Sequence, residues 1–454
     1  MLRSIRILTL LIAFAFSAIG SFAQTSKWRD VIKIKKKDTI YSICRKYGIT
    51  EDQLRQANPE MQSPDYQLKK GSYICIPFAD TPTGTSAPTG KQPARAVVKQ
   101  QADGRLRIGI MLPLNDKTKD GRLMTEYYRG VLMACDSLKQ TGYSIDIAAW
   151  NVTDQGSTVN TALLDPHAAK CDIIIGPYYN SQVARLTEFT ALNRQLLVIP
   201  FTIDAPELYT NRHIFQIYQP QNEQTANTVH RLTEWFKNYH PIIVDCADPQ
   251  STKGAFTATL RREFDVKGIS YNLTSTQSAT ADFQRAFSTS QPNIVILNSS
   301  RTSDMNILFG KLSTLTAGNS GVKVAVFGYP EWQSNAGANI TNFHRYDVYI
   351  PAPFYFNILA VPTDRFVKKY RATFHEDMQQ GLPKMAVTGF DHAMYFLKGL
   401  KQYGRQFDGA TAHSDYTPLQ TPLKFERRGN GGLQNRAQLF IHYKPDHKVD
   451  LIKY

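Results

Sequence analysis

Cysteine is scarce in this sequence, with five residues in a chain of 454. So few cysteines exclude the densely cross-linked scaffold of small secreted domains. Cys135 falls in an apolar helical stripe, and Cys171 and Cys246 border strand-like runs, so these three are expected to be small buried hydrophobes. Cys44 and Cys75 both lie in the first predicted module, and the sequence leaves open whether they form a disulfide bridge.

Catalytic and metal-binding motifs are also lacking. The chain has no His-Glu-x-x-His zinc motif, no P-loop and no Gly-x-Ser-x-Gly nucleophile elbow. Its ten histidines are scattered without the spacing of metal ligands. A nucleophilic cysteine needs an exposed site with a basic partner, whereas the three cysteines outside residues 30–77 stand in apolar surroundings. We therefore expect no catalytic residue, no metal site and no cofactor, and we predict that the protein is not an enzyme.

Long apolar runs are absent after the N-terminal region, so no later segment is expected to cross a bilayer. The N-terminus has two arginines, an apolar run over residues 7–16, and the small residues Ser21 and Ala23. This order is typical of a cleaved secretory signal peptide over residues 1–23. An uncleaved anchor is the alternative, but the run is shorter than the roughly 20 residues of a membrane span. We expect an exported, periplasmic and cell-wall associated protein with no transmembrane segment after cleavage.

Acidic residues are outnumbered by basic ones. The 38 Asp and Glu residues face 53 Lys and Arg residues, which gives a net charge of +15 and a sequence pI near 9.4. A positive surface favours anionic partners such as wall polymers or lipid head groups. Export argues against nucleic acid as a partner. A basic face that is merely solvated is the alternative interpretation.

Composition and periodicity divide the remainder of the chain. Residues 78–104 are rich in Thr, Pro, Gly, Ala and Gln, which predicts a flexible linker. Residues 105–454 alternate amphipathic helical patterns with short apolar runs, which predict strands at 106–112, 145–150, 171–176, 196–201, 242–246, 294–297 and 322–327. Such alternation predicts an α/β fold in which parallel sheets are covered on both faces, in two successive series.

Residues 30–77 resemble a LysM module. The resemblance rests on Lys37-Asp38-Thr39-Ile40, on Asn58-Pro59-Glu60 and on the run from Leu68 to Pro77. It implies a small βααβ domain that binds peptidoglycan through its N-acetylglucosamine-containing glycan. The family's shallow sugar groove lies between two loops, which here correspond to Asp38, Thr39, Ile40, Asn58, Pro59, Glu60 and Met61. Lys37 departs from the glycine usual in the family. Thr50 and Gln53 have the spacing of a helix capping box.

Residues 105–454 resemble the type I periplasmic binding proteins, and in particular the branched-chain amino acid receptors. The resemblance rests on the order of several motifs, among them Ile108-Gly109-Ile110, Ile175-Gly176-Pro177, Ile199-Pro200-Phe201-Thr202 and Phe327-Gly328-Tyr329-Pro330-Glu331. It implies two α/β lobes with parallel sheets, joined by three crossovers near residues 219–223, 349–356 and 419–425. Lobe 1 would then take about 105–220 and 355–418, and lobe 2 about 221–354 and 419–454.

The same resemblance implies a ligand cleft between the lobes. Ser181 matches the family residue that holds the ligand carboxylate, at a helix start where free N–H groups favour an anion. Glu331 would meet the ligand's ammonium group. The whole predicted set is Tyr178, Asn180, Ser181, Phe201, Thr202, Ser251, Tyr329 and Glu331. The alternatives are a helix cap for Ser181, a solvated acid for Glu331 and hinge packing for Tyr329. The loop that contains Ser251 lacks the family's aromatic residue, which argues against a free amino acid.

Two functions are open at this stage. The first is a non-catalytic exported protein that binds peptidoglycan and carries a binding domain for a small solute or a wall fragment. The second is an interaction protein that regulates cell-wall synthesis or remodelling enzymes and has no small-molecule ligand. Stabilisation of the larger domain by a solute would favour the first function, and a flat response would favour the second.

Overall fold

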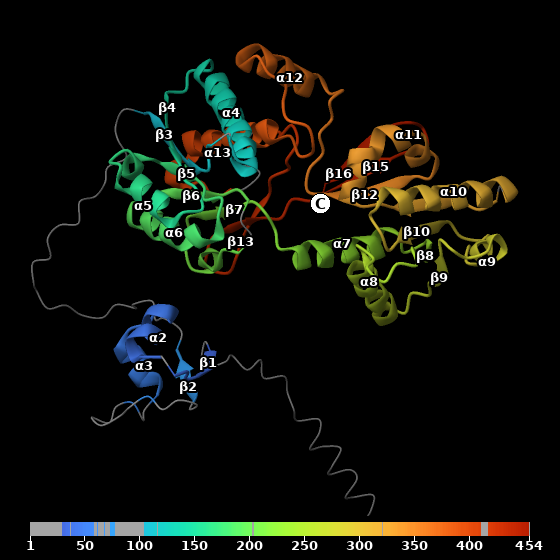
Figure 1. Ribbon diagram of the computed structural model, residues 1–454, viewed down its shortest axis with the longest axis horizontal. Coiled ribbons are helices and arrows are strands. Elements are labelled where there is room, and N and C mark those ends of the chain that lie inside the picture. Colours follow the sequence, from blue (N-terminus) through green and yellow to red (C-terminus); the bar gives the residue numbers. More distant parts are fainter. Residues whose placement is uncertain are drawn as a thin grey trace, which may run out of the picture. The chain divides into compact units, whose positions relative to one another are not determined.

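The computed structural model describes residues 30–36, 38–58, 61, 68, 73–77, 104–115, 117–201, 204–319, 321–409 and 416–453. The predicted signal peptide and residues 78–103 lie outside these ranges. The chain divides into two compact units, Met1–Val97 and Val98–Tyr454 (Figure 1). None of the helices in the described ranges is both long and apolar enough to span a membrane.

The smaller unit has the predicted βααβ order. It consists of β1 (Asp30–Lys33), α2 (Ile40–Tyr47), α3 (Glu51–Ala57) and β2 (Tyr73–Ile76), and the two strands pair antiparallel. Both helices begin with a capping box: Thr39 pairs with Ser42, and Thr50 pairs with Gln53 as predicted. The two helices and two strands close over a small core that includes Ile43, Leu54, Met61, Ile74 and Ile76. Cys44 is a buried free thiol, so the structure contains no Cys44–Cys75 bridge.

Lobe 1 of the larger unit is built on a seven-stranded sheet. Its strand order is β13-β14-β7-β6-β5-β3-β4, and all neighbouring pairs are parallel except β13 with β14. The bounds are β3 (Leu106–Leu112), β4 (Ile145–Asn151), β5 (Ile173–Ile175), β6 (Leu196–Ile199), β7 (Ile214–Gln216), β13 (Phe425–Arg427) and β14 (Leu433–Asn435). Because successive side chains of a strand point to opposite faces, the apolar runs of these strands require cover on both sides.

Helices supply that cover. One face of the sheet packs on α4 (Lys119–Lys139) and α13 (Met385–Tyr403), and the other packs on α5 (Gly156–Leu164) and α6 (Val183–Leu192). A fifth helix, α12 (Val361–Phe374), packs beside α4 and α13 through Phe366 and Tyr370. Lobe 1 also has short 3-10 turns at η2 (Ala168–Lys170), η3 (Asn180–Gln182), η4 (Pro206–Tyr209) and η6 (Gly404–Gln406), and lobe 2 has one at η5 (Pro330–Asn335).

Lobe 2 repeats this plan. Its strand order is β16-β15-β12-β11-β10-β8-β9, in which the pairs from β12 to β9 are parallel and the pairs β12–β15 and β15–β16 are antiparallel. The strands are β8 (His240–Asp245), β9 (Asn272–Ser275), β10 (Asn293–Leu297), β11 (Val324–Phe327), β12 (Val348–Ala352), β15 (Leu439–Tyr443) and β16 (Val449–Lys453). The helices are α7 (Gln221–Trp235), α8 (Gly254–Lys267), α9 (Thr280–Arg285), α10 (Thr302–Gly318) and α11 (Ala336–Arg345).

Three chain passages join the lobes. The first occupies 217–220 between β7 and α7, close to its predicted place, and the second occupies 353–360 between β12 and α12. The third lies at 436–438 between β14 and β15, and its predicted place at 419–425 is wrong. The reason is the β13–β14 hairpin, which completes the sheet of lobe 1. Phe425 packs its ring 5.2 Å from Phe215 and 5.6 Å from Phe396, and this apolar contact holds the hairpin in lobe 1.

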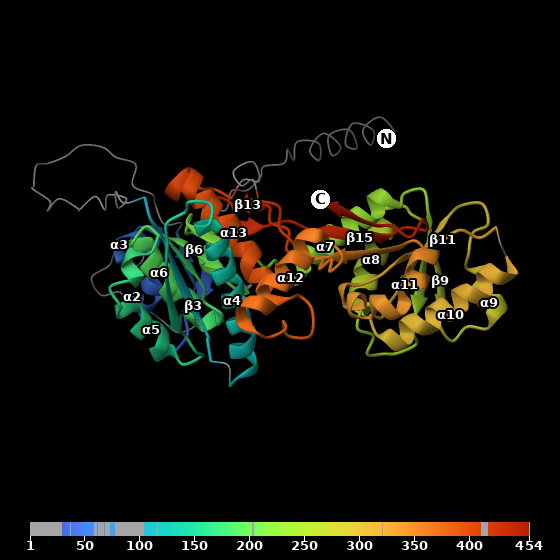
Figure 2. The same cartoon turned by 90° about the horizontal axis from the view of Figure 1, so that it is seen from above.

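The α4–α13 crossing matters for the site because it positions one wall. The two helices lie side by side in both views (Figures 1 and 2). A Cβ atom added to Gly130 would come within 1.9 Å of the Ala386 carbonyl oxygen, and one added to Gly389 within 2.0 Å of the Tyr127 carbonyl oxygen. The backbones therefore touch at two glycines. This close approach brings the buried Tyr127 of α4 against His392 of α13.

Candidate functional site

In the smaller unit, the predicted groove residues mostly stabilise their own loops. The Asp38 carboxylate accepts the Lys35 backbone N–H at 2.7 Å, and Thr39 caps α2. Asn58 is buried and donates from Nδ2 to the Leu54 carbonyl at 2.8 Å. Ile40 packs against the core, and Met61 is fully buried within it. Lys37, Pro59 and Glu60 lie outside the described residues. The side chains of Asp38, Thr39 and Asn58 are thus hydrogen-bonded within their own segments of the chain.

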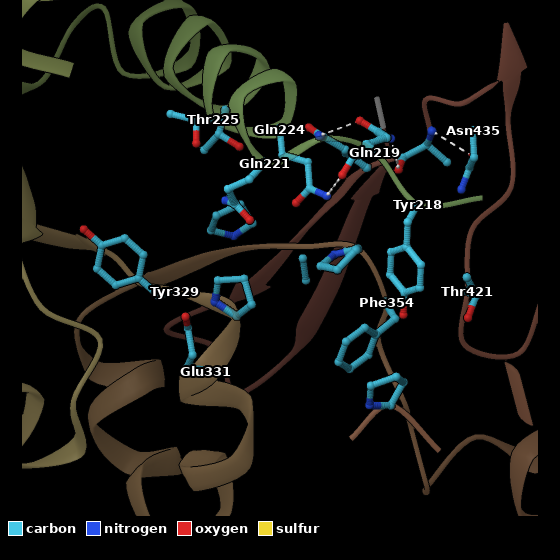
Figure 3. Close-up of a pocket in the computed structure, with 18 of the residues that line it drawn as sticks. Tyr218, Gln219, Gln221, Gln224, Thr225, Tyr329, Glu331, Phe354, Thr421 and Asn435 are labelled. Carbon is cyan, nitrogen blue, oxygen red and sulfur yellow. Dashed lines mark hydrogen bonds between the residues drawn. The ribbon is translucent and has the colours of Figure 1, made fainter. Parts of the chain in front are cut away.

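In the larger unit, a cavity of about 470 Å³ lies where the three crossovers meet (Figure 3). Its lining takes Ile217, Tyr218 and Gln219 from the first crossover. The second contributes Pro353 and Phe354, and the third Ala437 and Gln438. Both lobes supply walls to the same space. A ligand in this cavity would therefore contact the passages about which the lobes are expected to rotate.

The wall from lobe 2 is formed by α7, the start of α8 and the turn after β11. Gln221, Gln224 and Thr225 line it from α7, and Figure 3 shows Tyr329 and Glu331 on one side of the space. The Lys253 ammonium donates to Glu331 Oε1 at 2.7 Å and lies 4.9 Å from the centre of the Tyr329 ring.

The ion pair changes the role predicted for Glu331. That residue was expected to meet a ligand ammonium group, but its carboxylate already has a cation. Lys253 and Glu331 are the two charged residues among the cavity lining, and they compensate each other. A ligand ammonium at this point would also face the Lys253 charge, which would repel it.

The wall from lobe 1 includes Tyr218, Thr388, His392 and Thr421. Burial lowers the pKa of His392 to about 3, so the ring is a neutral imidazole at ordinary pH. Its Nδ1 atom lies 2.9 Å from the Tyr127 hydroxyl. The loop that contains Thr421 is held by the neighbouring buried carboxylate of Asp391.

Asp391 holds that loop with four hydrogen bonds. Its Oδ1 accepts from the Tyr416 hydroxyl at 2.6 Å and from the Leu419 N–H at 2.7 Å. Its Oδ2 accepts from the N–H groups of Gln420 and Thr421, each at 2.9 Å. Burial raises the pKa of Asp391 to about 6, although these donors oppose the shift. The carboxylate therefore fixes the position of Thr421 at the cavity.

Amide side chains of the cavity lining connect the crossovers. Gln438 donates from Nε2 to Gln219 Oε1 at 3.3 Å, and Gln219 donates from its own Nε2 to the Ala437 carbonyl at 3.4 Å. Gln224 of α7 donates to the Gln219 carbonyl at 3.0 Å. Nearby, Glu223 pairs with both Arg428 and Arg436. These contacts tie the first crossover to the third.

The structure brings only part of the predicted cleft set to this cavity. Tyr329 and Glu331 line it. Tyr178 and Phe201 lie one layer behind Tyr218, since the Phe201 ring is 5.9 Å from Tyr178 and 6.0 Å from Tyr218.

Three other polar members of the predicted set, Asn180, Ser181 and Ser251, are not in the cavity lining. Asn180 and Ser181 sit exposed on η3, outside the cavity lining. The Ser251 hydroxyl donates to the Asn298 carbonyl, and Thr202 lies outside the described residues.

Sequence reasoning missed the amides and His392. The predicted first crossover already contained Gln219, and the dense glutamines from Gln216 to Gln224 were a usable signal for a polar lining. For His392, no sequence pattern marks the residue as facing a cavity. Within the described ranges, no group of three or more His, Cys, Asp or Glu residues could hold a metal ion.

Comparisons with known proteins divide the chain in the same way. The model of the LysM domain family matches residues 32–77. SpoIVD-associated factor A of Bacillus subtilis (strain 168) is 29% identical over 68 residues, which are 15% of this chain. The chain covers 17% of that protein's length, so this relative bears on one segment only.

Solved structures resemble the larger unit. A protein described as a branched-chain amino acid ABC transporter from Rhodospirillum rubrum aligns with a TM-score of 0.51 at 13% identity, over 77% of this chain and 100% of its own. An ABC-type branched-chain amino acid transporter from Rhodopseudomonas palustris aligns with a TM-score of 0.45 at 13% identity, over 76% of this chain and 95% of its own. Such low identity shows the fold alone. The chain thus carries a LysM domain at residues 32–77, followed by a unit with the two-lobed fold of the type I periplasmic binding proteins.

Proposed function

We propose that this protein is an exported, non-catalytic binding protein that docks on peptidoglycan through its LysM domain and holds a small solute or a wall fragment between its two lobes. The LysM match at residues 32–77 is the observation that carries the proposal. The capped helices and closed core of that unit support a folded glycan-binding module.

The larger unit supports the second half of the proposal. Its cavity lies between two lobes and is lined by polar side chains together with aromatic rings, as ligand sites commonly are. Tethering by the LysM domain would raise the concentration of this cavity near wall material. Periplasmic location follows from the predicted signal peptide together with a wall-binding module.

Sedimentation with insoluble peptidoglycan tests the docking role. We expect the full chain to sediment with peptidoglycan and a chain that begins at Arg105 to stay in the supernatant. Soluble N-acetylglucosamine oligomers should release the full chain. Equal sedimentation of both chains would refute the role assigned to the LysM domain.

An interaction protein is the second candidate, and one observation favours it. Ile358, Leu359 and Val361, at the second crossover and the start of α12, are 60%, 89% and 68% exposed. Exposed apolar residues that gather in one place often mark protein contacts. The partner would be an enzyme of cell-wall synthesis or remodelling. Replacing Leu359 with Ser should weaken binding of such a partner and leave sedimentation with peptidoglycan unchanged.

A further inference from the structure

Two buried polar atoms on the cavity lining lack a hydrogen-bond partner within the described part of the chain. They are Nε2 of His392, a residue that is 1% exposed, and Oε1 of Gln438, a residue that is 7% exposed. A buried polar atom without a partner is destabilising, and nearly all such atoms in folded proteins are satisfied. Both residues belong to the lining of a cavity of about 470 Å³, so a ligand in that space is the candidate for supplying the missing partners.

The tautomer of His392 follows from its neighbour. The buried Tyr127 hydroxyl lies 2.9 Å from His392 Nδ1, and its proton needs an acceptor because an unpaired buried donor is destabilising. The hydroxyl therefore donates to Nδ1. A neutral imidazole then carries its proton on Nε2, so the atom without a partner is a donor.

The amide network fixes the other group. Gln438 uses Nε2 to donate to Gln219 Oε1, and this leaves its carbonyl oxygen Oε1 as an acceptor. The cavity thus presents one unused donor and one unused acceptor, both neutral. A secondary amide has the complementary pair, a carbonyl oxygen and an N–H group.

The charges of the cavity argue for a neutral ligand. Lys253 and Glu331 already compensate each other at 2.7 Å. A zwitterionic amino acid would have to compete with this pair, in which Lys253 is 19% exposed, or leave its own charges without partners. Figure 3 shows neutral polar side chains of α7, Gln221, Gln224 and Thr225, on one side of the space and the rings of Tyr218 and Phe354 on the other. Hydroxyl-bearing rings with an apolar face fit such a lining.

We infer that the cavity binds an uncharged N-acetylated amino sugar, whose acetamido group accepts from His392 Nε2 and donates to Gln438 Oε1. This inference rests on the proposed function, since a LysM domain would hold the chain beside polymers made of such sugars.

Calorimetry on the full chain tests it, because the two compact units are expected to unfold in separate transitions. Saturating N-acetylglucosamine should raise the transition temperature of the larger unit. We expect no rise in that temperature with glucosamine, which carries an ammonium group, with glucose, which lacks the acetamide, or with leucine. A shift with leucine, or with an N-acetylated peptide alone, would overturn the inference.

Two variants of His392 separate binding from folding. His392→Asn keeps a partner for Tyr127 near the Nδ1 position and removes the Nε2 donor. His392→Gln restores a donor near Nε2 and gives up the Tyr127 contact. We expect His392→Asn and Gln438→Met to weaken sugar binding at least tenfold, while His392→Gln retains more of it. Unchanged affinity in His392→Asn, with a ligand-free melting temperature like that of the parent, would count against the assigned contact.

Sedimentation with peptidoglycan distinguishes failure of the cavity inference from failure of the proposed docking role. If the full chain sediments but N-acetylglucosamine does not raise the transition temperature of the larger unit, the inference fails and the docking role stands. If the full chain does not sediment, the docking role fails whatever the cavity binds.

Discussion

His392 and Asp391 are adjacent on α13, and burial shifts their pKa values in opposite directions. The pKa of His392 falls from 6.5 to about 3, and that of Asp391 rises from 3.8 to about 6. The folded state therefore binds fewer protons than the unfolded state at His392, and more at Asp391. The His392 contribution to stability is present above pH 6.5 and is lost as the pH falls toward 3. The Asp391 contribution is present below pH 3.8 and is lost as the pH rises through 6.

When one of the two residues is replaced, the pH dependence of the free energy of unfolding should reflect the titration of the other. Between pH 7 and pH 5, His392 alone lowers the free energy of unfolding by about 2 kcal/mol, and Asp391 raises it by about 1 kcal/mol. We expect His392→Asn to be more stable at pH 5 than at pH 7, relative to the parent. Asp391→Asn should show the reverse and should also be destabilised, because four donors lose a carboxylate. Urea denaturation at both pH values measures this, and parallel profiles for all three proteins would contradict it.

At the scale of the element, the crossing of α4 and α13 depends on two glycines. A methyl group at position 389 would overlap the Tyr127 carbonyl oxygen. We expect Gly389→Ala to lower the free energy of unfolding by about 1–3 kcal/mol, or more if the helices separate. The displaced Tyr127 would also disturb His392, so the cavity should be affected together with stability.

Gly310 in α10 provides a matched control. It is also inside a helix, but a Cβ atom added there would meet nothing within 4 Å. Gly310→Ala should therefore stabilise by about 0.5–1 kcal/mol through helix propensity alone. Thermal or urea unfolding of both variants checks the pair. Equal effects of the same sign would show that the close contact at Gly389 does not matter.

At the scale of the whole molecule, Glu223 joins two of the passages between the lobes. It follows the first crossover, and its partners Arg428 and Arg436 lie in the β13–β14 hairpin and at the third crossover. The three side chains are 20–24% exposed, so solvent screens them only in part. Removing the carboxylate would leave two guanidinium groups close together.

Glu223→Gln should therefore lower the free energy of unfolding of the larger unit by about 1–3 kcal/mol. The deficit should shrink at high salt, which screens the repulsion between the arginines. Glu426→Gln is the control, because Glu426 is 55% exposed and lies 3.9 Å from Arg436. Urea titrations at low and high salt measure both variants. A salt-independent deficit would exclude this electrostatic account.

Much of the architecture could be predicted from local pattern. All seven predicted strands of the larger unit are present, and all except the edge strand β4 are mostly buried apolar runs. The β13–β14 hairpin escaped prediction because its strands are short and its place is decided by contact with Phe215, some two hundred residues earlier. Short strands carry too few residues to show a period.

The candidate site was less predictable, for a physical reason. Its lining comes from three crossovers that are remote in sequence, and pairs such as Lys253 with Glu331 form only in the folded chain. The family resemblance suggested Glu331 as a cleft residue, and Glu331 is in the cavity lining, but the resemblance could not show that its charge is already compensated. The position of His392 beside Tyr127 depends on the helix crossing at Gly130 and Gly389, and no local sequence pattern reveals this crossing.

The cavity is lined by all three passages between the lobes, and these passages are the expected hinge of the larger unit. A ligand bound among Tyr218, Phe354 and Gln438 would contact the passages between the lobes and would therefore restrict the angle between the lobes directly. Any protein that senses this angle could then respond to the ligand without touching it. Ligand occupancy would then set the relative orientation of the outer surfaces of the two lobes.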